Sequence, residues 1–248
     1  MANEEEDYQS VADSYAGFAS AEKIYLLRVV KCRPGGAGEY ANRFEASIES
    51  LRERSPSLAP LGAWRTVYGP YDEVTHLHEF DNLADLEADV ELLQAESPGP
   101  ASSFDLQESR TSKILRGLIH CPQPIEMRGE IEAPDRRICM MVNVRCTRAG
   151  MGNFIEHFAS GIENRRGLAR NLVPVGAWRT IYGGPYYVIH HIYTFDSLED
   201  MDDLRRVLYR DETFQSHIKI NTSPVLPNFW EWGGYSKLMK PLSYSQMR

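Results

Sequence analysis

The residues best suited to chemistry are two histidines separated by one residue, His76 and His78, within a largely apolar stretch. If this stretch is a strand, its side chains alternate between two faces, so both imidazoles lie on the same face. A later stretch places His191 and Tyr193 together in the same way. Imidazole titrates near neutral pH, which makes these side chains candidates for moving protons.

One guanidinium and several aromatic rings extend the candidate set. Arg28 suits a carboxylate or an enolate oxygen because a guanidinium presents several donors in a fixed geometry. Tyrosine hydroxyls can donate to the same oxygen, and large rings can line a cavity. The predicted catalytic residues are His76, His78, Arg28 and His191. The predicted substrate-binding residues are Trp64, Tyr68, Trp178, Tyr182 and Tyr193.

These candidates lie in a sequence that is duplicated. The octet from Gly62 to Gly69 returns as Gly176 to Gly183, 114 residues later, with a single Val-to-Ile exchange. One extra glycine, Gly184, then shifts the offset to 115. Such self-similarity indicates two copies of one unit. The Trp-Arg-Thr segment of the octet is identical in both copies. This favours a structural role, because catalytic residues tend to become asymmetric between the copies after a duplication.

Hydrophobic periodicity assigns the same elements to both copies. Stretches rich in β-branched residues predict strands, and apolar residues recurring at three and four predict helices. In the first copy the strands are 24–31, 58–68, 72–80 and 109–118, and the helices are 39–54 and 83–94. In the second copy the strands are 138–146, 171–182, 186–195 and 224–232, and the helical segments are 152–166, 198–209 and 214–220. This β-α-β-β-α-β order is that of a ferredoxin-like unit.

Two such units can close one barrel. Each sheet has one face covered by its own helices, and stacking the two open faces buries both. The predicted fold class is α+β, with two fused ferredoxin-like units forming an intramolecular dimeric α/β barrel. Its divisions are an acidic extension at 1–20, a first unit at 21–118, a linker at 119–136, a second unit at 137–232 and a C-terminal tail at 233–248. We assign the faces carrying His76 and His191 to the barrel interior, because a histidine pair is awkward to pack beneath helices.

Composition excludes several classes of function. A net charge of -8 disfavours nucleic acid, since phosphate binding needs clustered Lys and Arg. No apolar run approaches the roughly 18 residues that would cross a bilayer. The four cysteines show no C-x-x-C spacing, which favours a reducing, cytoplasmic setting. The expected partner is a small-molecule substrate, with no nucleic acid and no membrane, and a homodimer of the fused barrel stays open.

Several segments resemble one known family. In the first copy they are Ile24-Tyr25-Leu26-Leu27-Arg28, Arg33-Pro34-Gly35, Gly69-Pro70 and the run from Val74 to Leu83. In the second copy they are His191 and Phe195-Asp196-Ser197-Leu198, with Val142 in place of Arg28. The chain thereby resembles the NIPSNAP family, within the dimeric α/β-barrel superfamily. The resemblance implies the barrel fold and places Arg28 inside it. We therefore predict the chemistry on the first-copy side, with His76 or His78 as acid–base group and Arg28 as anchor.

Three functions stay open, because the superfamily spans monooxygenases, isomerases, polyketide cyclases, haem enzymes and ligand sensors. The first is a cofactor-independent enzyme for proton transfer, isomerisation or cyclisation of a ketone- or phenol-rich substrate, in natural-product biosynthesis. The second is a cofactor-free monooxygenase acting on an electron-rich substrate. The third is a non-catalytic NIPSNAP-type binding or adaptor protein.

No cofactor and no metal are predicted. His76, His78 and His191 could form a three-histidine metal site, and His157 or His217 could ligate haem. Neither arrangement has the spacing of a metal or haem motif. The glycines at 35–38 do not form a dinucleotide fingerprint, so nucleotide binding is not expected.

Overall fold

The computed structural model describes residues 23–95, 103–118, 137–147, 150–185, 187–213, 215 and 236–247. Within these residues, eight strands form one closed antiparallel barrel in the order β1-β3-β2-β8-β5-β7-β6-β4. The predicted α+β fold, built from two ferredoxin-like units fused into one barrel, is confirmed.

The first unit supplies β1 (Ile24–Cys32), α2 (Ala37–Arg54), β2 (Gly62–Tyr68), β3 (Glu73–Phe80), α3 (Leu83–Ala95) and β4 (Gln107–Gly117). Helix α2 is amphipathic and buries Tyr40, Ile48 and Leu51. β2 begins later than predicted because a 3-10 turn, Pro56–Leu58, precedes it. The proline at the start of that turn has a fixed φ and no N–H to donate to a strand ladder.

The second unit repeats the order with β5 (Ile138–Arg145), α4 (Met151–Leu168), β6 (Gly176–Tyr182), β7 (Val188–Phe195), α5 (Leu198–Arg210) and β8 (Ser236–Pro241). Helix α4 buries Phe154, Ile155, Phe158 and Ile162. As in the first unit, a 3-10 turn, Arg170–Leu172, delays the start of the second strand. The duplication seen in the sequence is therefore a duplication of the fold.

The closing strand lies later in the chain than predicted. The predicted strand at 224–232 and most of the helical piece at 214–220 lie outside the described residues. β8 instead occupies part of the segment interpreted as a C-terminal tail, and it pairs with both β5 and β2. The division at residue 232 is therefore wrong. Two lysines and a proline in six residues give β8 little strand propensity, so only its pairing reveals it.

The two units close the barrel by sharing their last strands. β4 pairs with β1 of its own unit and with β6 of the other, and β8 pairs with β5 and β2 in the same way. Leu27 pairs with Lys113 across β1 and β4, and Met141 pairs with Lys237 across β5 and β8. Because Leu27 and Met141 are separated by the 114-residue offset, Lys113 and Lys237 occupy equivalent places in the two units.

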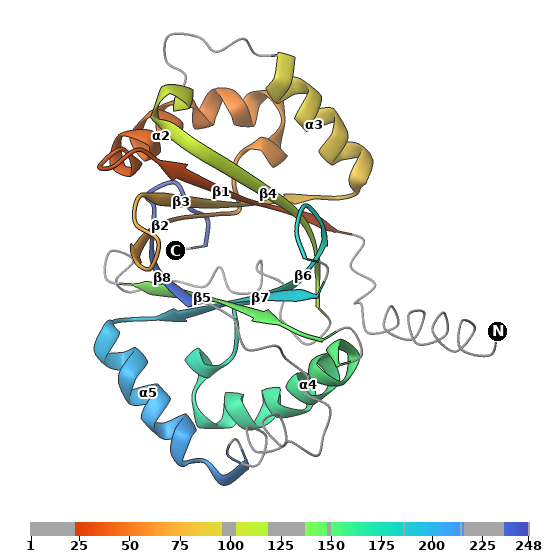
Figure 1. Ribbon diagram of the computed structural model, residues 1–248, viewed down its shortest axis with the longest axis vertical. Coiled ribbons are helices and arrows are strands. Elements are labelled where there is room, and N and C mark those ends of the chain that lie inside the picture. Colours follow the sequence, from red (N-terminus) through yellow and green to blue (C-terminus); the bar gives the residue numbers. More distant parts are fainter. Residues whose placement is uncertain are drawn as a thin grey trace, which may run out of the picture.

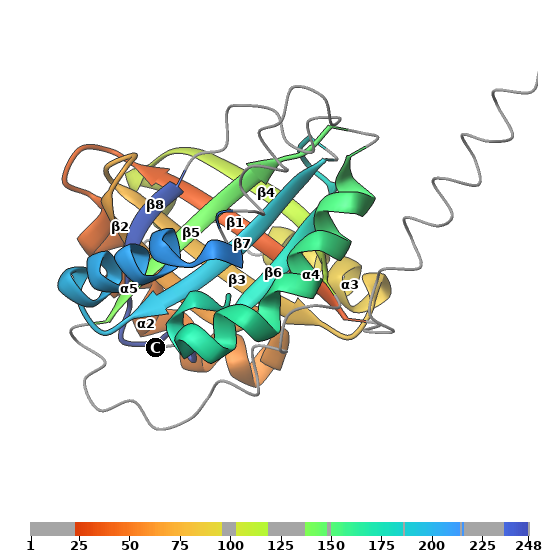
Figure 2. The ribbon, with the colours of Figure 1, turned by 90° about the horizontal axis from the view of Figure 1, so that it is seen from below.

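Helices cover the two outer sides of the barrel. Figure 1 shows α2 and α3 against the sheet of the first unit, and α4 and α5 against the sheet of the second, with both sheets between them. Seen from below, α4 and α5 lie across the second-unit strands (Figure 2). Each strand therefore has one face toward a helix layer and one face toward the barrel interior.

The interior face is not the one predicted. The interior core draws residues from both units, among them Tyr25, Leu27, Leu77, Met141, Ile192 and Met239. The opposite faces pack beneath helices, where Val30 and Val74 contact Tyr40 of α2. Since Leu77 points inward, His76 and His78 point outward beneath α2. The assignment of the His76, His191 and Arg28 faces to the interior is therefore wrong.

The tryptophans of the repeated octet fill the middle of the barrel. Trp64 and Trp178 are 0% and 2% exposed and belong to the interior core. Each indole lies over the glycine that begins its octet, so that a Cβ on Gly62 or Gly176 would sit 2.0 Å from the ring. This close approach explains why glycine precedes each tryptophan by two residues.

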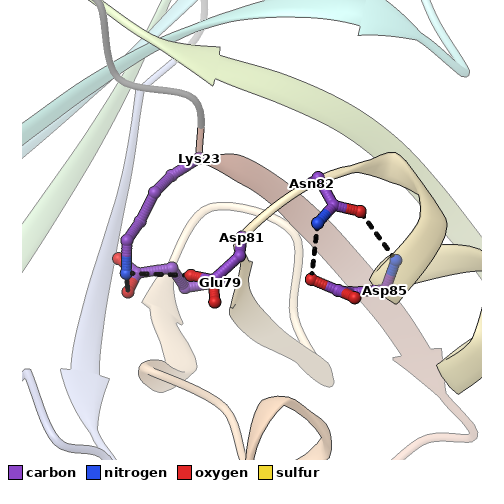
Figure 3. Close-up of polar contacts among 5 residues, drawn as sticks. All are labelled: Lys23, Glu79, Asp81, Asn82 and Asp85. Carbon is purple, nitrogen blue, oxygen red and sulfur yellow. Dashed lines mark hydrogen bonds and ion pairs between the residues drawn. The ribbon is translucent and has the colours of Figure 1, made fainter.

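Just before β1, Lys23 lies near two carboxylates, Glu79 in β3 and Asp81 just after it. Lys23 Nζ donates to Glu79 at 2.7 Å and lies 3.5 Å from Asp81 (Figure 3). The next residue, Asn82, caps α3, because its Oδ1 accepts from the backbone N–H groups of Ala84 and Asp85. These contacts fix where β3 ends and α3 begins.

Candidate functional site

A polar cavity of about 120 Å³ lies between the two sheets at one end of the barrel. Exposed residues, Pro70 and Thr111, lie on its wall, so it reaches the surface. Leu27 and Met141 form part of its apolar lining. Its ionisable and amide side chains are Glu73, Lys113, Asn143, His190 and Lys237.

Lys237, on β8, is buried and has a countercharge. Its Nζ donates to Glu73 at 3.1 Å and to the Thr75 hydroxyl at 2.8 Å, and its side chain is 2% exposed. Burial lowers the pKa of Lys237, while the Glu73 carboxylate opposes that shift. The pair crosses from β8 of the second unit to β3 of the first, so it holds the two units together at the cavity.

Lys113, on β4, is the first-unit equivalent of Lys237, but among the described residues it has no carboxylate to balance its charge. The position that corresponds to Glu73 in the second unit is occupied by Val188. Lys113 is half-buried and makes no hydrogen bond or ion pair with any residue that the structure describes. Burial and the nearby Lys237 charge lower the pKa of Lys113. The cavity therefore holds two ammonium groups and one carboxylate.

His190, on β7, joins the cavity wall through a buried network. Its Nδ1 faces Asn143 Oδ1, and its Nε2 lies 2.9 Å from the Thr180 hydroxyl. Since an amide oxygen only accepts, Nδ1 carries the proton and Nε2 accepts from Thr180. Burial, followed by the charges of Lys113 and Lys237, lowers the pKa of His190 to about 3. His190 is therefore a neutral, fixed imidazole at physiological pH.

This arrangement suits an oxygen that carries or develops negative charge. Lys237 is paired with Glu73, which leaves the Lys113 ammonium to attract such an oxygen in a partly enclosed, low-dielectric space. Among the described residues, the carboxylate of Glu73 is the one anionic group on the wall, and it can accept a proton. His190 and Asn143 hold the polar wall in one geometry.

His76 and His78 lie away from this cavity, beneath α2. The His76 ring stacks on Phe44 at 4.3 Å, and its Nε2 lies 3.0 Å from the Tyr244 hydroxyl. His78 Nδ1 donates to the Ser57 carbonyl at 3.1 Å. Burial lowers the pKa of His76 well below its usual value, and burial with the Arg28 charge lowers that of His78 to about 3. Both are packed, neutral imidazoles, and their catalytic role stays a prediction.

Arg28 and His191 also lie on helix-covered faces. Arg28 pairs across the ladder with His76, and its pKa is lowered by burial and by the nearby Arg110. His191 stacks on Phe158 of α4 at 4.5 Å and lies edge-on to Tyr193. The structure therefore brings Arg28 together with His76 and His78, and His191 together with Tyr193, on opposite sides of the molecule.

The predicted substrate-binding rings do not converge. Trp64 and Trp178 are packed in the interior core, and neither lines the cavity. Tyr68 and Tyr182 lie at the ends of β2 and β6, where they are 56% and 62% exposed. Their shared parity with the tryptophans does not keep them inside, because the β2–β8 ladder shifts register between Thr66 and Tyr68. The β4–β6 ladder shifts in the same way between Thr180 and Tyr182.

The described residues contain no cluster of three or more His, Cys, Asp or Glu side chains able to hold a metal. The three-histidine arrangement considered from the sequence does not form, because His191 lies on the sheet opposite to His76 and His78. His157 lies on α4, and His217 is outside the described residues.

Sequence reasoning missed Lys113, Lys237 and His190. His190 is adjacent to His191, which was predicted from the sequence. The only error there was the choice of which strand face points into the barrel. Lys237 lay in a segment not recognised as a strand. The signal that could have located the two lysines is the correspondence of Leu27 with Met141 between the two copies. It leads to Lys113 and Lys237 only when the pairing of β8 with β5 is known.

The sequence comparisons agree on one family. The NIPSNAP family model matches residues 25–115 and 143–225, once in each unit. A NipSnap protein of Caenorhabditis elegans is 23% identical over 92% of this chain, and this chain spans 41% of its length. The NipSnap protein of Drosophila melanogaster is 25% identical over 76% of this chain and 68% of its own length.

A solved structure confirms the barrel. An anthrone oxidase-like protein superposes with a TM-score of 0.62 over 90% of this chain and 92% of its own, at 11% identity. Identity this low establishes the shared dimeric α/β-barrel fold alone. Separately, none of the helices in the described ranges is both long and apolar enough to cross a membrane.

Proposed function

The chain belongs to the NIPSNAP family, and from that premise we propose that it is a cofactor-independent small-molecule enzyme. The proposed reaction is proton transfer on a ketone- or phenol-rich substrate, leading to isomerisation or cyclisation. The proposed site is the polar cavity at the end of the barrel, rather than the helix-covered faces that carry His76 and His191.

The observation that carries the proposal is the ammonium of Lys113, which has no ion-pair or hydrogen-bond partner among the residues that the structure describes. A half-buried cation without a countercharge is costly, and a ligand oxygen that bears negative charge would compensate it. When a proton leaves the carbon beside a ketone, or the hydroxyl of a phenol, the negative charge collects on oxygen. Lys113 would stabilise that oxygen as it forms, which is the way an oxyanion site accelerates a reaction.

Glu73 and His190 take the supporting roles. Glu73 is the carboxylate on the cavity wall, so it is the proposed proton acceptor, and Lys237 holds it in place. His190 is unsuited to accept the proton, because its pKa of about 3 and its bond from Thr180 leave Nε2 weakly basic. It would position Asn143 and the polar wall instead.

Hydrogen–deuterium exchange tests the proposal without knowledge of the natural substrate. The protein is incubated in D2O with acetoacetate, hydroxyacetone and resorcinol, and exchange of their acidic hydrogens is followed by proton NMR. Exchange above the buffer rate is expected, with a loss of about a hundredfold or more in Lys113→Met and Glu73→Gln, each measured on protein whose folding is confirmed by circular dichroism. Lys31→Met, which removes an exposed lysine on β1, is the matched control. Equal exchange in all four proteins would contradict the proposal.

A cofactor-free monooxygenase is the second candidate, favoured by the shared fold with the anthrone oxidase-like protein. In that reaction a substrate methylene is oxidised to a carbonyl, dioxygen is the oxidant, and water is the co-product. An oxygen electrode with anthrone as the substrate distinguishes the candidates, since proton transfer alone consumes no oxygen. Ligand binding without exchange or oxygen uptake would instead indicate a non-catalytic binding protein.

A further inference from the structure

We propose that Lys113 is an amine nucleophile that forms a Schiff base with a small ketone or aldehyde in the cavity. The inference rests on the proposed function, because it uses the same site, and it names the substrate class as a carbonyl compound. In the proposed function Lys113 contacts an oxygen through its charge, whereas here its nitrogen bonds to carbon.

The pseudo-symmetry of the barrel separates the two lysines into different roles. Lys237 is held by Glu73 and Thr75, so its nitrogen is occupied. Lys113 lines the same cavity from the equivalent place but has neither an acid nor a hydroxyl partner among the described residues. Its nitrogen is therefore the one that a ligand in the cavity can reach.

The turn between β6 and β7 positions the Lys113 stem. A Cβ on Gly184 would lie 3.2 Å from Lys113 Cε and 3.5 Å from its Cδ. Gly184 is the extra residue that follows the second octet and has no counterpart after the first. A bare backbone at this turn thus leaves room for the Lys113 side chain to run along it. A Cβ at 3.2 Å is closer than most such contacts, so the flexible lysine stem would have to shift by a few tenths of an ångström.

The charges around Lys113 make its neutral amine easier to form. The groups that line the cavity with it are Lys237 from β8, Glu73 from β3 and the neutral His190 from β7. Glu73 is paired with Lys237, so its negative charge does not go to Lys113. Burial and the Lys237 ammonium accordingly lower the pKa of Lys113, and a lysine beside a second cation is activated as a nucleophile.

The step balances without any added reagent. The Lys113 ammonium loses its proton, which Glu73 can accept, and the amine attacks the carbonyl carbon to give a carbinolamine. Return of that proton to the hydroxyl releases water and leaves a cationic iminium. One ammonium and one carbonyl compound thus give one iminium and one water. The iminium draws electrons from the neighbouring carbon and so assists the proposed proton transfer.

The cavity volume limits the size of the carbonyl-bearing end of the substrate. About 120 Å³ corresponds to roughly four water molecules at ~30 Å³ each. A carbonyl carbon with one or two small substituents fits this space, and a larger remainder would extend past Pro70 and Thr111 to the surface.

Reductive trapping tests the inference. The protein is incubated with acetone or pyruvate and sodium cyanoborohydride at pH 7, and the modified lysines are mapped by peptide mass spectrometry. Lys113 is expected to react several-fold faster than the exposed Lys240 and Lys31, because each unit of pKa lowering raises the amine fraction about tenfold. Labelling of Lys113 no faster than Lys240, or labelling of Lys237 in its place, would overturn it.

Two variants separate this inference from the proposed function. Lys113→Arg keeps the cation but cannot form an imine. If it still catalyses exchange and wild-type Lys113 is not trapped, the Schiff base is wrong and the proposed function stands. Gly184→Ala should slow trapping at Lys113 by displacing the stem, whereas Gly152→Ala, where a Cβ meets nothing within 4 Å, should not. Equal trapping in both glycine variants would contradict the positioning argument.

Discussion

Lys113 and Lys237 occupy equivalent register positions in the two halves of the barrel, but of the two only Lys237 has a carboxylate partner among the described residues. Lys113 lies opposite Leu27, and Lys237 lies opposite Met141 at the 114-residue offset. The difference arises on the neighbouring strand, where the first unit has Glu73 and the second has Val188. The two equivalent lysines share one cavity, and this exchange leaves Lys113 without a carboxylate partner among the described residues.

Glu73→Gln should destabilise the protein strongly. The substitution leaves Lys237 buried without its countercharge, and removing one partner of a buried pair typically costs about 3–5 kcal/mol. The matched control is Glu108→Gln, which breaks the exposed pair with Lys31 and should cost less than about 1 kcal/mol. Urea unfolding of both variants measures the difference. Equal losses would mean that the Lys237–Glu73 pair contributes no more than a surface pair.

Stability should fall as the pH drops below neutrality. The pKa of His190 is about 3 in the folded protein, against about 6.5 when unfolded, so protonation favours the unfolded chain. The stability is fully present above about pH 6.5 and declines as the pH falls toward 3. Between pH 6.5 and pH 5 this histidine accounts for about 2 kcal/mol. His190→Gln should show a shallower decline in urea unfolding, and parallel curves would contradict the shift.

Gly62→Ala and Gly176→Ala should each destabilise the barrel. The added methyl would overlap the Trp64 or Trp178 ring, and overpacking a core costs about 1–3 kcal/mol. Gly152→Ala near the start of α4 is the control, because its Cβ meets nothing within 4 Å and alanine favours a helix. Thermal unfolding should rank the control at or above wild type. A neutral Gly62→Ala would show that the indole can move aside.

His76→Gln and Tyr244→Phe should affect stability rather than turnover. Both remove the contact between the His76 ring and the Tyr244 hydroxyl, and losing such a hydrogen bond costs about 0.5–1.5 kcal/mol. Proton exchange at the cavity should persist at the wild-type rate in each folded variant. Loss of exchange in His76→Gln, with circular dichroism unchanged, would instead support the catalytic role predicted for His76 from the sequence.

The fold could be predicted from the sequence because the patterns that indicate it are local and occur in both copies. The octet occurs twice, and periodicity placed most helices and strands within a few residues of their observed bounds. The errors have physical causes. Proline at 56 replaced the start of β2 with a turn, and the polar β8 carries too few β-formers to be recognised without its partners.

The candidate site could not be predicted because it depends on which strand face turns inward. Alternation groups His76 with His78 and separates both from Leu77, but it does not say which group meets the helices. An imidazole can pack beneath a helix when rings such as Phe44 and a hydroxyl such as Tyr244 surround it. One cavity residue, His190, was therefore the immediate neighbour of a predicted one, His191, on the opposite strand face.

The most direct test of the cavity at the barrel end is to follow histidine ring signals during ligand titration. Protein labelled with nitrogen-15 in its histidines is titrated with acetoacetate, in wild type and in Lys113→Met. Because His190 lies on the cavity wall and His76 lies beneath α2, their signals report on different places. Saturable shifts are expected at His190 that vanish in Lys113→Met, with His76 and His78 unchanged. Shifts at His76, His78 or His191 that persist in Lys113→Met would contradict it.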